Sequence, residues 1–213
     1  MNLNSIWRAS ADSSRSRRRG GMLVESALVI AFLLVPLILG LIVVGFNLIR
    51  AVQVNQINRD AGHMFARNVD FSSNASGQGN RAVIYQMAPR LKTTTSAGTA
   101  VLILSAIQYI GSNTCSSCGN LNHAVFKQQL VLGNPSLHAS KFGTVSTSSL
   151  TSDGTGTVKD PLNDATVRTD GILAKLPMLD GDMAYVAETY YSSTDIDIPG
   201  FISPSGVYAR AIF

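Results

Sequence analysis

The sequence predicts an α+β protein in which a long N-terminal helix precedes a domain built on an antiparallel β-sheet. Three observations support this fold class. Residues 22–49 form a run of 28 residues that is almost wholly apolar. In residues 51–70 apolar side chains recur every three or four positions, the period of a helix with one buried face. The rest of the chain alternates Val-, Ile- and Tyr-rich runs with Gly-, Ser- and Thr-rich stretches, which is typical of strands joined by loops.

The apolar run predicts a transmembrane helix over residues 21–50. Its only charged residue is Glu25. A helix of this length measures about 42 Å, whereas a bilayer core of ~30 Å needs only about 20 residues. The run also exceeds the roughly 7–15 apolar residues of a cleaved secretory signal. We therefore expect it to stay in the mature protein, with a local kink at Pro36, which lacks a backbone donor.

The basic residues ahead of this helix predict its orientation. The net charge is +4, and residues 1–20 hold five arginines against one aspartate, so the remainder is formally neutral. Arginines flank the cytoplasmic end of membrane helices, which makes Arg17, Arg18 and Arg19 the topology signal. We expect residues 1–20 to be a cytoplasmic leader and the C-terminal domain to lie outside the cytoplasm. Nucleic-acid binding is not indicated, because the basic cluster adjoins an apolar segment.

Beyond the membrane segment we expect an amphipathic helix over residues 51–70 that packs on the extracytoplasmic domain, residues 71–213. Gly62 weakens this helix slightly. A short helix is predicted at residues 81–91, and residues 133–181 predict long loops with one short element near residues 171–176. Four strands are predicted, at residues 99–110, 124–132, 183–191 and 206–213.

The two cysteines, Cys115 and Cys118, form a CxxC motif within a Ser/Asn/Gly-rich loop. A redox motif would stand at the start of a helix, whose dipole lowers a thiol pKa. An oxidising compartment favours a structural disulfide instead, and a loop this small gains little stability from one. We interpret the pair as a structural disulfide, with redox function and free thiols as the alternatives.

No pattern of catalytic or metal-binding residues is recognisable, so we expect neither an enzyme nor a cofactor. Motifs of the types G-x-S-x-G, H-E-x-x-H, P-loop and G-x-G-x-x-G are missing from the sequence. A zinc site assembled from Cys115, Cys118, His123 and His138 would have an unfamiliar spacing. No metal site is therefore predicted.

The junction between leader and apolar helix resembles a known family. Residues 17–28 read RRRGGMLVESAL, a basic leader followed by glycine, a glutamate five residues after Gly20, and an apolar helix. This arrangement resembles the signal of type IV prepilins. It looks most like the TadE/TadG-like pseudopilins of Tad (Flp-type) pilus systems, over about residues 15–70.

The resemblance implies how this segment works. A membrane aspartyl prepilin peptidase would cut between Gly20 and Gly21, where the missing side chain lets the backbone enter its site. Glu25 would then be the fifth residue of the mature chain. In that family this glutamate is thought to pair with the new α-amino group of a neighbouring subunit, so that two charges costly in lipid neutralise each other.

Two departures from the major pilin of Flp systems favour a minor pilin or pseudopilin. Ser26 follows the glutamate where the major pilin has tyrosine, and a large domain follows the helix. The function expected is a membrane-anchored structural component of a Tad-type pilus or secretion apparatus in the bacterial inner membrane. Its partners would be other pilin subunits, the assembly machinery and the prepilin peptidase. The alternative is a signal-anchored extracytoplasmic binding or enzymatic domain unrelated to pili.

Overall fold

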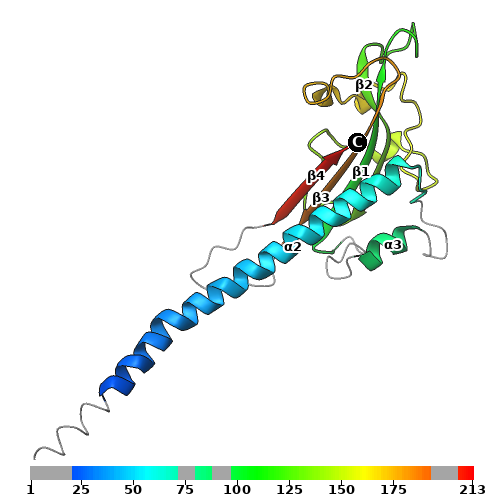
Figure 1. Ribbon diagram of the computed structural model, residues 1–213. Helices are drawn as coiled ribbons and strands as arrows, with labels where there is room; N and C mark the ends of the chain where they lie inside the picture. Colours follow the sequence, from blue (N-terminus) through cyan, green and yellow to red (C-terminus); the bar gives the residue numbers. More distant parts are fainter. Residues whose placement is uncertain (1–20, 72–79, 88–96, 193–205) are drawn as a thin grey trace, which may run out of the picture. The chain divides into compact units, whose positions relative to one another are not determined.

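The computed structural model describes residues 21–71, 80–87, 97–192 and 206–213. It divides into two compact units, with the boundary between Leu48 and Ile49. The first unit consists, in its described part, of helix alone. The second contains a four-stranded sheet, the end of the long helix and the loops that cover the sheet (Figure 1). Each unit is described by itself.

One helix, Gly21–Ala66, runs from the first described residue into the second unit. It contains a π-helical turn, η1 (Ile30–Leu34), and continues as α2 (Val35–Ala66). Pro36 has no N–H to donate, and its ring meets the carbonyl of the residue four positions earlier. A π turn at this point changes the local hydrogen-bond pattern and accommodates the ring. The kink predicted at Pro36 stays a prediction, and the π turn that ends two residues before it was not predicted.

The N-terminal part of this helix leaves its apolar side chains uncovered. In residues 21–49 every side chain except Val43 is exposed or half-exposed. Among the described residues this is the one helix long and apolar enough to cross a membrane. A core helix of a soluble domain would instead be buried by its own chain.

The sheet has four antiparallel strands in the order β2-β1-β3-β4 (Figure 1). The strands are β1 (Ala100–Ile110), β2 (His123–Gly133), β3 (Met183–Tyr191) and β4 (Val207–Ile212). All four predicted strands are confirmed, each within one residue at either end. The expected α+β class is likewise present, as one long helix with an antiparallel sheet.

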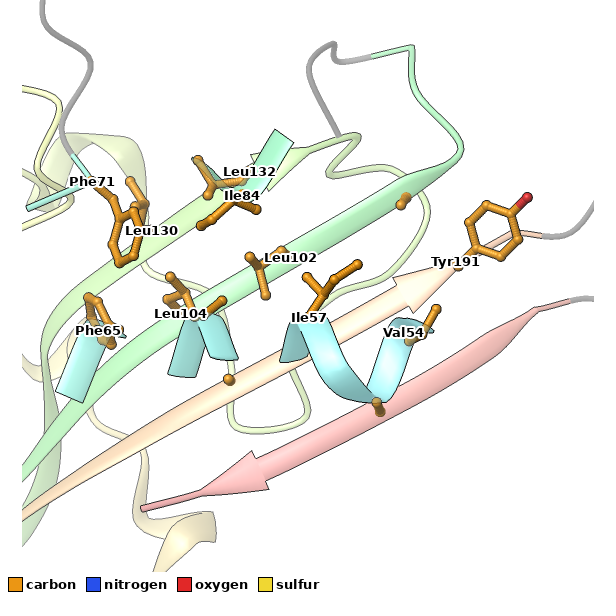
Figure 2. Packing of buried hydrophobic residues seen from close by; sticks show 14 of the residues in the cluster. Val54, Ile57, Phe65, Phe71, Ile84, Leu102, Leu104, Leu130, Leu132 and Tyr191 are labelled. Carbon is orange, nitrogen blue, oxygen red and sulfur yellow. The ribbon is translucent and has the colours of Figure 1, made fainter. Parts of the chain in front are cut away.

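One face of the sheet packs on α2 and on the short helix α3 (Asn80–Met87). The predicted apolar stripe of α2 is buried at Val54, Ile57, Ala61 and Phe65. Figure 2 shows Ile57 and Phe65 by the leucines of β1, Val54 near Tyr191 of β3, and Ile84 of α3 beside Leu132 of β2. Burying one such aliphatic side chain contributes about 1.5–3 kcal/mol. The helix predicted at residues 81–91 is confirmed up to its end at Met87; residues 88–96 lie outside the described part.

Contacts along β3 define the direction of α2 on the sheet. The guanidinium of Arg50 lies 5.7 Å from the ring centre of Tyr191. At the opposite end of the contact, the rings of Phe65 and Tyr185 meet edge to face, with centroids 5.9 Å apart. The helix therefore runs antiparallel to β3 and parallel to β4. Between these ends the Thr189 hydroxyl donates a buried 2.9 Å hydrogen bond to Asn58 Oδ1.

Gly62 permits the close approach of α2 to the sheet. A Cβ atom at this position would lie 2.3 Å from Phe213 Cε2 and 3.0 Å from the Ala187 Cβ. The rings of His63 and Phe213 also touch, with centroids 4.4 Å apart. From the sequence, Gly62 was expected only to weaken the helix slightly. Its place in the fold is a packing requirement, since no side chain fits between α2 and β3 here.

The second face of the sheet is covered by residues 133–181. These form irregular loops, as predicted, with three short 3-10 turns at Thr147–Ser149, Ala165–Val167 and Asp170–Ile172. They also supply a second hydrophobic core that the sequence did not predict. Its buried members from this segment are Phe142, Val145, Val158, Val167 and Ile172. As a result β1 is buried on both faces over most of its length.

Candidate functional site

The residues of the proposed processing site lie at the limit of the described chain. Arg17, Arg18, Arg19 and Gly20 are outside the described residues, whereas Gly21 is the first residue of the helix. A Cβ atom at Gly21 would meet no other atom within 4 Å. Space around Gly21 therefore does not by itself require glycine there.

Glu25 lies one helical turn beyond Gly21, and its side chain is exposed. It lines an open groove with Met22, Ser26, Val29 and Ile30. The Ser26 hydroxyl donates a 3.0 Å hydrogen bond to the Leu23 carbonyl of the same helix. Glu25 has no ion-pair partner among the described residues.

An exposed carboxylate on an otherwise apolar helix can accept a cationic partner from another chain. Glu25 is the only charged residue between Gly21 and Ile49. In hydrocarbon a lone carboxylate is costly, by roughly 2.5–3.5 kcal/mol near a helix centre and less near its end. Pairing with a positive group on another chain would remove this cost, so an ion pair at Glu25 would favour association of the two chains.

Cys115 and Cys118 lie half-buried in the loop between β1 and β2, and the structure shows no bond between their sulfur atoms. The Cys118 Sγ lies 4.0 Å from the Cys115 carbonyl oxygen. The Cys118 thiol lowers the pKa of Cys115 by hydrogen bonding to it, while burial raises the pKa of Cys118. A disulfide between them remains a prediction.

Asp180 fastens the loop that carries the cysteines. Its carboxylate accepts hydrogen bonds from the backbone of Gly111 (2.8 Å) and Asn113 and from the hydroxyl of Thr114 (2.5 Å). The Thr114 hydroxyl is the main reason that the pKa of Asp180 is lowered. These contacts have the form of a loop anchor.

The four residues considered for a zinc site are not brought together. His123 Nδ1 lies 2.7 Å from Asp170 Oδ2, whereas His138 stacks on Tyr190 with ring centroids 5.3 Å apart. Neither cysteine joins them in a cluster. Within the described part of the chain, no group of three or more His, Cys, Asp or Glu residues is arranged to hold a metal ion.

A buried carboxylate, Glu188 in the middle of β3, was missed by sequence reasoning. It is 1% exposed, and its Oε1 accepts hydrogen bonds from the Tyr208 hydroxyl (2.5 Å) and the Lys141 backbone (3.1 Å). Its Oε2 and the Nε2 of His138 are buried without hydrogen-bond partners. A single charged residue inside the apolar run MAYVAETYY was the available signal. The contacts tie the loop around residues 138–142 to β3 and β4.

The surroundings of the Tyr208 hydroxyl make the stability of the fold depend on pH in the alkaline range. Burial, and then the hydrogen bond and charge of Glu188, raise the pKa of Tyr208. The folded state therefore favours the neutral phenol of Tyr208. The stability that this preference adds is fully present below the ordinary tyrosine pKa of about 10, and it is lost as the pH rises above that value. Between pH 9 and pH 11.5 we expect the stability of the Tyr208→Phe variant to fall less than that of the parent protein. The urea unfolding midpoints of the two proteins at each pH measure this difference. Tyr109→Phe is the control for removing a hydroxyl, and equal slopes in all three proteins would contradict the assignment.

Comparison of the chain with protein-family models, with curated proteins and with solved structures finds no match. In its described part, the protein is of the α+β class, with an antiparallel sheet and one apolar N-terminal helix long enough to cross a membrane.

Proposed function

We propose that this protein is a minor pilin or pseudopilin of the TadE/TadG type, a membrane-anchored structural component of a Tad-type pilus or secretion apparatus. The observation that carries the proposal is that the two parts of one helix differ in what covers them. Its N-terminal part exposes apolar side chains and a single carboxylate, Glu25, while its C-terminal part buries a stripe on an antiparallel sheet. A helix of this kind can anchor a subunit, pack against its neighbours and hold a folded domain outside the membrane.

In this proposal the leader, residues 1–20, stays in the cytoplasm and is removed after Gly20. The helix lies in the inner membrane, and residues 51–213 lie on its outer side. Glu25 pairs with the α-amino group of a neighbouring subunit.

The direct test is the N-terminal sequence of the membrane-extracted protein, produced with and without a co-expressed prepilin peptidase. The expected result is a start at Gly21 only when the peptidase is present. Gly20→Leu is the control variant and should retain its leader, because a branched side chain blocks entry of the backbone into the peptidase. A start at Met1 in both samples would contradict the proposed class and favour a signal-anchored domain.

A further inference from the structure

The loop that joins β1 to β2 is held in place just ahead of its first cysteine, Cys115. The carboxylate of Asp180, which precedes β3, accepts hydrogen bonds from the Gly111 backbone at 2.8 Å and from the Thr114 hydroxyl at 2.5 Å. A Cβ atom at Gly111 would lie 2.5 Å from the carboxyl carbon of Asp180, so the two segments approach each other closely here. Thr114 directly precedes Cys115. Its position is therefore fixed by atoms other than sulfur.

The same loop is held a second time just after its second cysteine, Cys118. The side-chain amide of Asn120, which is fully buried, donates hydrogen bonds to the backbone carbonyls of Pro161 and Asp164, both at 2.9 Å. The amide oxygen of Asn120 accepts a 2.7 Å hydrogen bond from Arg168 Nε. Both ends of the loop are therefore fixed by hydrogen bonds that involve neither sulfur atom.

A disulfide between Cys115 and Cys118 would therefore add little to the fold. Only two residues separate the cysteines, and the stabilisation from a disulfide becomes smaller as the loop that it closes becomes shorter. The loop is also ordered already by the contacts of Asp180 and Asn120. Disulfides that hold a secreted fold together resist reduction, whereas exposed disulfides are reduced more readily. Both cysteines are half-exposed, which places this pair nearer to the second kind.

The two thiols are unequal, and the difference decides which of them reacts first. The Cys118 thiol donates a hydrogen bond to the Cys115 sulfur and so lowers the pKa of Cys115, whereas burial and then the same hydrogen bond raise the pKa of Cys118. Residues 111–122, all within the described part of the chain, contain no helix, so the neighbouring thiol acts here in place of a helix dipole. The thiolate is the attacking species in thiol–disulfide exchange. Cys115 is therefore the attacking residue and Cys118 is the residue that reacts second.

We propose that Cys115 and Cys118 are a reversible thiol–disulfide exchange site whose substrate is an organic disulfide. The Cys115 thiolate attacks one sulfur of the substrate and forms a mixed disulfide, and the other substrate sulfur leaves as a thiolate that takes up a proton. Cys118 then loses its proton to water and attacks the Cys115 sulfur, which releases the second half of the substrate as a thiolate that is protonated in turn. The dithiol of the chain is thereby oxidised to a disulfide, and the substrate is reduced to two thiols. None of these steps depends on the leader or on the membrane anchor.

Two disulfides serve as probes, glutathione disulfide for a small-molecule substrate and a disulfide-linked dimer of a synthetic cysteine peptide for a protein substrate. The full chain in detergent micelles is reduced, separated from the reductant and mixed with either probe at neutral pH. Samples quenched with acid are analysed by mass spectrometry. The parent protein should pass through a mixed disulfide on Cys115 and end as the internal disulfide, and an excess of reduced glutathione should restore the dithiol. The probe that reacts faster identifies the source of the substrate.

Serine variants test the separate roles of the two cysteines. Cys118→Ser keeps a hydrogen-bond donor beside Cys115 but cannot complete the exchange, so the mixed disulfide should accumulate. Cys115→Ser is the matched control and should react at least about threefold more slowly than Cys118→Ser, because burial opposes the thiolate of Cys118. The double variant and both redox states of the parent should share one urea unfolding midpoint, because the loop is anchored by Asp180 and Asn120.

Any of three results would overturn the proposal. A disulfide that stays intact in excess reduced glutathione, or a urea midpoint that falls clearly when the disulfide is reduced, would make the bond a structural one. A dithiol that reacts with neither probe would show that the pair is not an exchange site. A mixed disulfide that persists in the parent protein would show that Cys118 does not reach Cys115. Failure of the peptidase test would change none of these measurements, so the two outcomes are distinguishable.

Discussion

Replacing Gly62 by leucine is expected to destabilise the second unit by about 3 kcal/mol, the upper part of the range for overpacked interiors. A Cβ atom here already lies within 3.0 Å of Ala187 and closer still to the Phe213 ring. The ring can rotate away, but the Ala187 Cβ is fixed in the centre of the sheet. The helix must therefore move off β3, which loosens the burial of Ile57, Ala61 and Phe65. Urea unfolding followed by circular dichroism in micelles measures the loss.

Gly45→Leu is the matched control, because it lies in the same helix and a Cβ there meets nothing within 4 Å. It should leave the urea midpoint of the second unit unchanged. A second control combines Gly62→Ala with Phe213→Ala, which frees the space of the ring and should recover part of the stability lost in Gly62→Ala alone. Equal midpoints for Gly62→Leu and Gly45→Leu would show that Gly62 has no packing role.

If the proposed pilin-like function holds, Glu25→Ala is expected to lower incorporation of the protein into the pilus assembly at least about tenfold, equivalent to ~1.4 kcal/mol. The reason is loss of the only carboxylate that the apolar part of the helix offers to a cationic partner. Membrane insertion should remain intact, since removing a charge makes insertion more favourable. The measurement is the amount of variant that co-purifies with partner subunits, normalised to the amount resistant to carbonate extraction.

Ser26→Ala serves as the control for this experiment. Ser26 lines the same groove, but its hydroxyl is bonded to the helix backbone, so its loss should not affect incorporation. Glu25→Gln separates charge from shape and should behave like the alanine variant if ion pairing is what matters. Normal incorporation of Glu25→Ala would remove the role proposed for this residue and leave the anchor function of the helix untouched.

The elements that sequence reasoning predicted share one property: their signal is local and repeated. The four strands are continuous runs of branched and aromatic residues, and the buried stripe of α2 follows the helical period from Val54 to Phe65. Element positions were therefore predictable to within a residue or a few. The π turn was not predicted, because Pro36 indicates a disturbed hydrogen-bond ladder and a kink without fixing the geometry of the preceding turn.

The features that were missed depend on tertiary contacts. Phe142, Val145 and Val158 are isolated apolar residues in a polar segment, so no period marks them as a second core. The role of Gly62 depends on Phe213, more than a hundred residues away. The hydrogen-bond partners of the buried Glu188 are the Lys141 backbone and the Tyr208 hydroxyl, which lie on other segments of the chain. For Glu25 the structure adds exposure and an open groove, and the cationic partner proposed for it would come from another chain.

The placement of β1 has a consequence for the time course of folding. β1 lies between β2 and β3, yet β3 begins only at Met183, some seventy residues after β1 ends at Ile110. The stripe of α2 rests against the same late strand. Contacts between such distant segments are slow to form because the intervening chain must be closed into a loop. During synthesis, the helix and the first hairpin would therefore lack the strand that both pack against, and the unit would fold cooperatively only once Met183–Tyr191 had emerged.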